Sequence, residues 1–210
     1  VSGENLDHPL FESEAWEIPA LAELKKRASQ QLGTVGGGNH YCNIMVDEQD
    51  RVWVGVHFGS RGLGALTAKH YNQQAKAQGH IWNGVEVLPV ASELGQEYLA
   101  AMHLAGDYAY AGRDYVCRVI ADLCDGEIVE EIHNHHNFAW QETHFGESLW
   151  VVRKGSTPAF PGQKGFVGAS MAEPSVILEG VDSPESAELL YSTVHGAGRA
   201  MSRTAAKGKK

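Results

Sequence analysis

Four histidines of this chain stand beside glycine or asparagine, at points where a strand or a helix is expected to end. The four segments are GGGNH (36–40), HFGSR (57–61), HNHHN (133–137) and HGAGR (195–199). Imidazoles brought to loop ends from distant sequence positions are typical ligands of a transition metal, and a neighbouring asparagine can orient the second ring nitrogen. A set of hydrogen-bonded structural histidines is the alternative. The repeated context favours a metal site.

The last of these segments also has the features of a phosphate site. Glycines beside His195 leave backbone N–H groups and the imidazole open to close approach by a ligand. Arg199 and Arg203 are four residues apart, so they share one face if the segment is helical. A histidine, bare amides and two guanidinium groups together suit a phosphate. The alternative is a glycine-rich turn that leads into a surface helix.

Several familiar catalytic motifs are absent from the sequence. There is no GxxxxGKS/T loop, no GxGxxG after a strand and no HExxH. The nucleophile elbow GxSxG fails because Phe58 stands two residues before Ser60. The three cysteines form no CxxC pair, which argues against a disulfide framework or a cysteine-built zinc site and favours a reducing cytoplasm. No run approaches the roughly 20 apolar residues of a membrane span, so no membrane partner is expected.

Charge is distributed unevenly along the chain. The 210 residues include 17 Lys and Arg against 26 Asp and Glu, a net charge of −9. From Trp150 onward eight basic residues stand against five acidic ones, which gives +3, and the rest, with nine against 21, carries −12. The overall acidity argues against non-specific binding of nucleic acid, whereas a basic end around His195 is compatible with a local phosphate site.

The hydrophobic periodicity predicts an α+β fold rather than an alternating β–α repeat. A hairpin is expected from strands at 43–47 and 52–58, and Ser92 is the expected N-cap of a long helical segment. The expected helices are 20–31, 62–78, 92–124 (one helix or two) and 198–206. The other expected strands are 127–135, 148–153, 164–167, 175–178 and 191–194. Residues 1–19 are expected to be an extended lead-in, and Cys117 and Cys124 to be buried.

Six stretches together resemble the RtcB family of GTP-dependent RNA ligases, which act in tRNA splicing and RNA repair. The stretches are QLGTVGGGNH (31–40), VHFGSRGLG (56–64), HNHHNFAWQETHFGE (133–147), VVRKGS (151–156), ASM (169–171) and HGAGRAMSR (195–203). They occur in the family's order and span most of the chain. The resemblance implies a single α+β catalytic domain at 31–210, with antiparallel sheets, preceded by a lead-in segment and short helix at 1–30. Because the chain begins on Val1, it is expected to be part of a longer protein.

The resemblance also implies an activity. The family joins an RNA end that carries a 3′-phosphate or a 2′,3′-cyclic phosphate to a 5′-hydroxyl end, with GTP and two Mn²⁺ ions as cofactors. Its HGAGR histidine, here His195, attacks GTP to form a covalent guanylyl-histidine. The implied partners are broken or spliced RNA, including tRNA, and an activating protein. A neutral imidazole suits this chemistry, because it is a good nucleophile for phosphorus and leaves readily from a phosphoramidate.

The family's site residues carry over position by position. The resemblance places Arg61 and Arg199 near phosphates and RNA, and it implies that His40, His57 and His136 ligate the metal. The implied guanylate pocket comprises Asn39, His40, Tyr41, Cys42, Asn43, His136, Asn137, Gly168, Ala169, Ser170, Met171, Ser175, His195, Gly196, Ala197 and Gly198.

The sequence departs from the family pattern at several places. Asn43 replaces the usual glutamate that contacts guanosine, and Phe58 replaces a frequent serine beside the ligand His57. The family's Asp-x-x-Cys metal ligands and C-terminal lysine have no counterpart here, which is why a fragment of a ligase is expected. Two other functions are compatible with the same residues. One is a metal-dependent phosphodiesterase or cyclic phosphatase, and the other is a non-catalytic guanylate- or RNA-binding relative.

Overall fold

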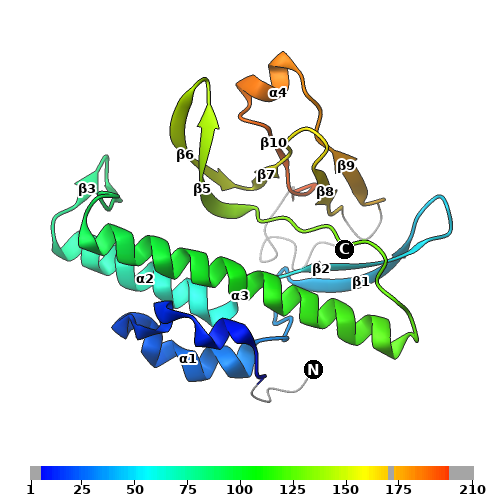
Figure 1. Cartoon of the computed structure of the whole chain (residues 1–210), viewed down its shortest axis with the longest axis horizontal. Coiled ribbons are helices and arrows are strands. Elements are labelled where there is room, and N and C mark those ends of the chain that lie inside the picture. The colour runs from blue at the N-terminus through cyan, green and yellow to red at the C-terminus, as the bar shows by residue number, and fades with distance from the viewer. Residues whose placement is uncertain (1–5, 170–172, 199–210) are drawn as a thin grey trace, which may run out of the picture. The chain divides into compact units, whose positions relative to one another are not determined.

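The computed structural model of the chain describes residues 6–169 and 173–198. The fold comprises helices and small antiparallel sheets, as expected for an α+β protein (Figure 1). The chain divides into two compact units, residues 1–129 and 130–210. The boundary near residue 30 that the sequence suggested stays a prediction.

The first unit is built on three helices, α1 (Pro19–Gln31), α2 (Arg61–Ala77) and α3 (Glu93–Leu123). Helix α2 packs against both α1 and α3, and the Tyr108 hydroxyl of α3 donates to the Ala28 carbonyl of α1 at 2.8 Å. Their apolar faces form the core of this unit. The buried core residues are Trp16, Leu21, Ala28, Leu32, Leu63, Tyr71, Ala101, Leu104, Ala105, Tyr108 and Ala111.

Helix α3 is one continuous helix of 31 residues. It begins where expected, because the Ser92 hydroxyl accepts a hydrogen bond from the Gly95 N–H at 3.0 Å and satisfies one of the free donors of the first turn. The predictions for α1 and α2 are confirmed to within one residue at each end.

The predicted hairpin is also confirmed, as β1 (Tyr41–Val46) and β2 (Val52–His57) in antiparallel register. Its turn is held by Asp47, whose carboxylate accepts hydrogen bonds from the Trp53 indole at 2.8 Å and the Arg51 guanidinium at 2.7 Å. The Trp53 bond is the main reason that the pKa of Asp47 lies well below its ordinary value. A second, shorter hairpin joins β3 (Ile81–Trp82) to β4 (Val85–Glu86).

In its described part, residues 130–169 and 173–198, the second unit contains three antiparallel strand pairs and a short helix, α4 (Pro184–Glu188). The pairs are β5 (Asn137–His144) with β6 (Glu147–Lys154), β7 (Ser156–Pro158) with β10 (Ser192–Val194), and β8 (Lys164–Val167) with β9 (Val176–Glu179).

A buried arginine ties these strands together. Arg153 of β6 has a side chain only 1% exposed, and its two terminal nitrogens donate to both oxygens of Glu142 in β5 at 2.6 and 2.9 Å. The same guanidinium donates to the Leu190 carbonyl and to the Ser192 hydroxyl at 2.7 and 2.8 Å. Arg153 therefore links β5 and β6 to β10, the strand that leads into His195, and it is a buried structural residue.

Some predictions were wrong. Residues 127–135 form no strand, and the neighbouring β5 and β7 were missed. The lead-in contains two 3₁₀ helices, η1 (Pro9–Glu12) and η2 (Glu14–Glu17), and it contributes Trp16 to the core. Cys124 is exposed and Cys117 only half-buried, although all three cysteines are free as expected. The helix expected at 198–206 lies almost wholly outside the described residues. Within the described ranges, no helix combines the length and apolarity that crossing a bilayer requires.

Candidate functional site

In the first unit, His40 and His57 lie near each other. His40 precedes β1 and His57 ends β2, and the antiparallel register that pairs Tyr41 with His57 brings the two rings to a centroid distance of 6.4 Å. Both imidazoles are half-buried. The hairpin thus joins two predicted metal ligands that are 17 positions apart in the sequence.

The orientation of the His40 ring is set by the loop before it. Its Nδ1 lies 2.9 Å from the Val35 carbonyl oxygen and 3.4 Å from Nη1 of Arg61. A carbonyl can only accept, so the shorter contact assigns the proton to Nδ1, and the longer approach of the guanidinium is no hydrogen bond. Nε2 of His40 then keeps its lone pair. This is the tautomer in which His40 can ligate a metal through Nε2.

The Arg61 guanidinium lies beside this histidine, in space that the first glycine of the GGG run leaves open. A Cβ atom at Gly36 would lie 1.8 Å from Nη1 of Arg61, so only glycine lets the guanidinium cover the loop. Nε of Arg61 donates to the Thr34 hydroxyl at 3.4 Å. Gly36 also has a φ of +79°, a backbone conformation that L residues rarely adopt. The structure therefore places a predicted phosphate-binding arginine next to a predicted metal ligand.

The segment after His57 is anchored by helix α3. Nη1 of Arg113 donates to the Phe58 carbonyl at 3.0 Å, and a Cβ atom at Gly112 would lie 3.2 Å from the buried Phe58 ring. Burial lowers the pKa of the Arg113 guanidinium, which packs over the Tyr110 ring. Sequence reasoning missed Arg113, because a single arginine inside a helical pattern carries no signal of a tertiary partner.

The alternation of β1 separates the predicted guanylate residues. Tyr41, which stacks on His57 at 5.4 Å, shares one face of the hairpin with Asn43. Cys42 lies on the other face, the same face as Ile44. Burial raises the pKa of the Cys42 thiol, which disfavours a reactive thiolate. Asn39 is exposed in the loop before β1.

In the second unit, His195 and His136 form a close pair. Their ring centroids are 4.4 Å apart, although the residues are 59 positions apart in the sequence. Nδ1 of His195 lies 2.8 Å from the Gly155 carbonyl oxygen, and the Gly155 N–H donates to the His136 carbonyl at 2.8 Å. The turn residue Gly155, with a φ of +76°, thus joins the two histidine segments.

The Gly155 carbonyl also sets the tautomer of the neutral His195 ring. Since the carbonyl accepts, Nδ1 of His195 carries the proton and Nε2 holds the lone pair. Nε2 is therefore the ring nitrogen of His195 that can act as a nucleophile or a ligand. The sequence placed Gly155 in the VVRKGS stretch (151–156) but gave no sign of this contact, because a backbone carbonyl leaves no mark in residue types.

The other predicted pocket residues of this unit also meet. Gly168 forms a bridge with Gly196, its carbonyl accepts from the Ala197 N–H at 3.0 Å, and the Ala169 N–H donates to the Ser175 hydroxyl at 3.1 Å. A Cβ atom at Gly196 would lie 3.1 Å from the Gly168 oxygen, which explains a glycine there. The Ala197 N–H is already used and is not available to a phosphate.

The remaining predicted residues are less constrained by contacts. Asn137 starts β5 opposite Lys154 and is exposed, as is Gly198, whose φ is +68°. Ser170, Met171 and Arg199 lie outside the described residues. The structure thus brings together His40, His57 and Arg61 in one unit. In the other unit it brings together His136 and His195, and it joins Gly168 and Ala169 to Ser175, Gly196 and Ala197.

Comparison with known proteins identifies the family. The family model described as "tRNA-splicing ligase RtcB" matches residues 12–210, and this chain belongs to the RtcB family. Among curated proteins, "RNA-splicing ligase RtcB1" of Escherichia coli ATCC 25922 and "RNA-splicing ligase RtcB" of Escherichia coli K12 are each 36% identical to it over 197 residues. Each match covers 85% of this chain and 47% of the relative. The chain therefore spans about half the length of these relatives.

Proposed function

We propose that this chain carries the histidine nucleophile of an RNA ligase that joins a 3′-phosphate or 2′,3′-cyclic phosphate end to a 5′-hydroxyl end through a guanylyl-histidine. Support comes from the family, from the names of the relatives and from one geometric observation. That observation is the hydrogen bond from Nδ1 of His195 to the Gly155 carbonyl, which leaves Nε2 as the reactive nitrogen.

The proposed reaction balances on this nitrogen. The Nε2 lone pair attacks the α-phosphorus of GTP, the P–N bond forms, and the P–O bond to pyrophosphate breaks. The proton stays on Nδ1, where the Gly155 carbonyl stabilises the positive charge that the ring acquires. An oxygen of the RNA 3′-phosphate then takes the guanylyl group and frees His195. Finally, the 5′-hydroxyl oxygen displaces GMP and forms the phosphodiester; a cyclic phosphate end must first be opened by water.

The described residues also fit a metal cofactor. In the first unit His40 and His57 are the proposed ligands, and the Val35 carbonyl leaves Nε2 of His40 unprotonated for that role. In the second unit His136 is the proposed ligand. Bound Mn²⁺ would supply charge neutralisation at the phosphates and orientation of the leaving pyrophosphate. Arg61 is the proposed contact for a phosphate in the first unit. Asn39, Tyr41, Asn43, Gly168, Ala169 and Ser175 are the proposed guanylate contacts.

The test is guanylylation of the longest natural polypeptide that contains this sequence. Incubation with GTP labelled at the α-phosphate and with Mn²⁺ should give labelled protein, and the label should be acid-labile and base-stable, as expected of a phosphoramidate. His195→Ala should abolish labelling, and His80→Ala, which removes a histidine of the first unit that takes no part in the proposed site, should retain it. Labelling that persists in His195→Ala refutes the nucleophile. Release of 3′-phosphate RNA without GTP-dependent joining selects the phosphodiesterase, and GMP binding without labelling selects the non-catalytic relative.

A further inference from the structure

Helix α2 continues away from Arg61 with an unusual charge distribution. Its 17 residues include Arg61, Lys69 and Lys76 but no aspartate or glutamate, in a chain with 26 such residues and a net charge of −9. A carboxylate-free, positively charged helix in an acidic protein is suited to a polyanion, because like charges elsewhere on the surface would repel the ligand from other faces.

The basic residues share one face of the helix. At 100° per residue, Arg61, Lys69 and Lys76 fall within about 80° of one another, and Ala65, Ala68 and Asn72 fall on the same side. The opposite side carries the buried residues Leu63, Thr67 and Tyr71, and the buried Ala75 lies at its edge, next to Ala68. Because this opposite side forms the core contact, the basic face is the outer side of α2.

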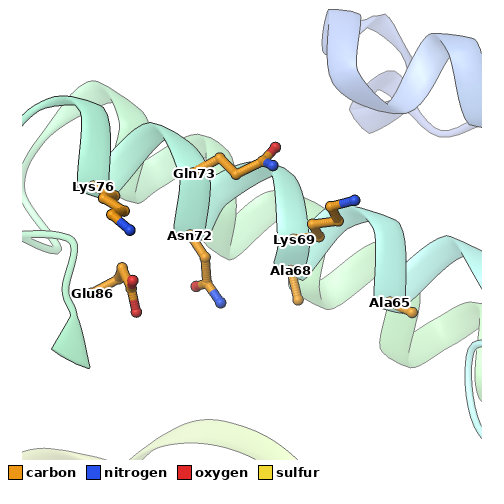
Figure 2. A pocket seen from close by; sticks show the side chains of 7 residues that line it. All are labelled: Ala65, Ala68, Lys69, Asn72, Gln73, Lys76 and Glu86. Atoms are coloured by element: carbon orange, nitrogen blue, oxygen red, sulfur yellow. The ribbon is translucent and has the colours of Figure 1, made fainter.

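Residues of this face line a shallow depression that is wide open to solvent. Ala65, Ala68, Lys69, Asn72, Gln73 and Lys76 line a depression of about 490 Å³, and Glu86 of β4 lies at one end. Figure 2 shows Ala65, Ala68 and Asn72 along one side of α2, with Lys76 facing Glu86. The alanines leave room for a chain of sugars and phosphates to approach the helix, and the amides of Asn72 and Gln73 can donate to phosphate oxygens between the two lysines.

The dimensions suit a nucleic-acid strand. Lys69 and Lys76 are seven residues apart, about 10 Å along the helix axis, and Arg61 lies about 22 Å from Lys76 on the same measure. Arg61 itself contacts the loop that carries His40. One helix face therefore runs from the predicted phosphate contact at its first residue to a basic hollow at its far end.

We propose that this face, defined as Lys69, Asn72, Gln73 and Lys76, binds the phosphate backbone of single-stranded RNA. The inference rests on the proposed function, since RNA is its substrate, and it adds a contact that positions the strand without reading its sequence. Its contribution is electrostatic, so it depends on salt. Each phosphate contact on a single strand contributes about 0.7 to the slope of log affinity against log salt.

The experiment measures binding of a fluorescent 16-nucleotide oligouridine by anisotropy between 50 and 200 mM NaCl. Lys69→Gln with Lys76→Gln should lower the magnitude of the salt slope by about 1.4, the value for two lost contacts. The matched control is Lys25→Gln with Lys26→Gln, which removes the same charge from exposed positions of α1 in the same unit and should leave the slope unchanged. Glu86→Gln should strengthen binding.

Three outcomes overturn the inference. The salt slope changes equally in the two double variants, it does not change in the α2 variant, or the unmodified protein does not bind the oligouridine. GTP labelling of the unmodified protein, measured on the same preparation, tests the proposed function separately. A labelled protein whose α2 pair leaves the salt slope unchanged retains the proposed function and loses only the strand contact.

Discussion

The buried pair of Arg153 and Glu142 allows a quantitative prediction about the second unit. Arg153→Met keeps most of the apolar stem but removes the guanidinium, and Glu142 is left only 10% exposed with His144 as its remaining partner at 2.7 Å. Removing one partner of a buried ion pair costs about 3–5 kcal/mol, because an uncompensated charge stays in the interior. The lost bonds to Leu190 and Ser192 act in the same direction.

The measurement is hydrogen exchange of the β5 and β6 amides followed by mass spectrometry, which reports local opening. At about 1.4 kcal/mol for each factor of ten, protection should fall by roughly two to three and a half orders of magnitude. Lys154→Met, one residue away and exposed, is the control and should change protection little. Arg153→Met combined with Glu142→Met should recover much of the loss, since no buried charge remains.

The same pair predicts a dependence on pH. Burial by itself would raise the pKa of Glu142, but hydrogen bonds from Arg153 and His144 outweigh it and hold the pKa below its ordinary value. Because the folded pKa lies below the unfolded value of about 4.3, the stabilisation is complete above that pH and is lost as pH falls through the folded pKa. The double variant should lack this acid loss. If the opening free energy of β5 and β6 in Arg153→Met, measured by hydrogen exchange, lies within about 0.5 kcal/mol of the wild-type value, the reasoning is refuted.

Two further predictions concern the histidine segments. Gly155→Ala should destabilise the protein by about 1–2 kcal/mol, because the backbone at this position is left-handed. The added methyl group itself would meet only ordinary van der Waals contacts. A thermal melt measures the loss of stability, and ¹⁵N spectra of His195 show whether Nδ1 keeps its proton. An unchanged melting temperature would contradict the assigned conformation. Arg113→Met should loosen the segment after His57 and weaken Mn²⁺ binding by about tenfold or more, as titration by electron paramagnetic resonance would show. Arg118→Met, exposed on the same helix, is its control, and equal affinities would remove Arg113 from the site.

Local sequence determined the helices and the first hairpin. The apolar spacing of α1 and α2 and the Ser92 cap act within a few residues of the chain, so periodicity and capping chemistry are enough to place them. The strands of the second unit were harder to predict. β5 was missed because polar residues dominate it, yet Glu142 and His144 are among its more buried members, since they pair with Arg153 or with each other.

The prediction of a strand at residues 127–135 was wrong because a sequence pattern does not show whether a partner strand is present. The segment alternates well enough to suggest a strand, but a strand exists only where another backbone supplies hydrogen bonds, and residue types do not name that partner. For the same reason, residue types did not reveal that Arg153 is the centre of a buried network.

The sequence by itself determined which residue types the candidate site contains and which family the motifs resemble. Only the tertiary structure decided that His40 meets His57, that His136 meets His195, and that the Val35 and Gly155 carbonyls set the protonation of two of these rings. The physical reason is that a carbonyl oxygen has the same identity at every position of the chain. What it does to an imidazole depends on where the fold points it, and that direction arises from contacts between residues far apart in sequence.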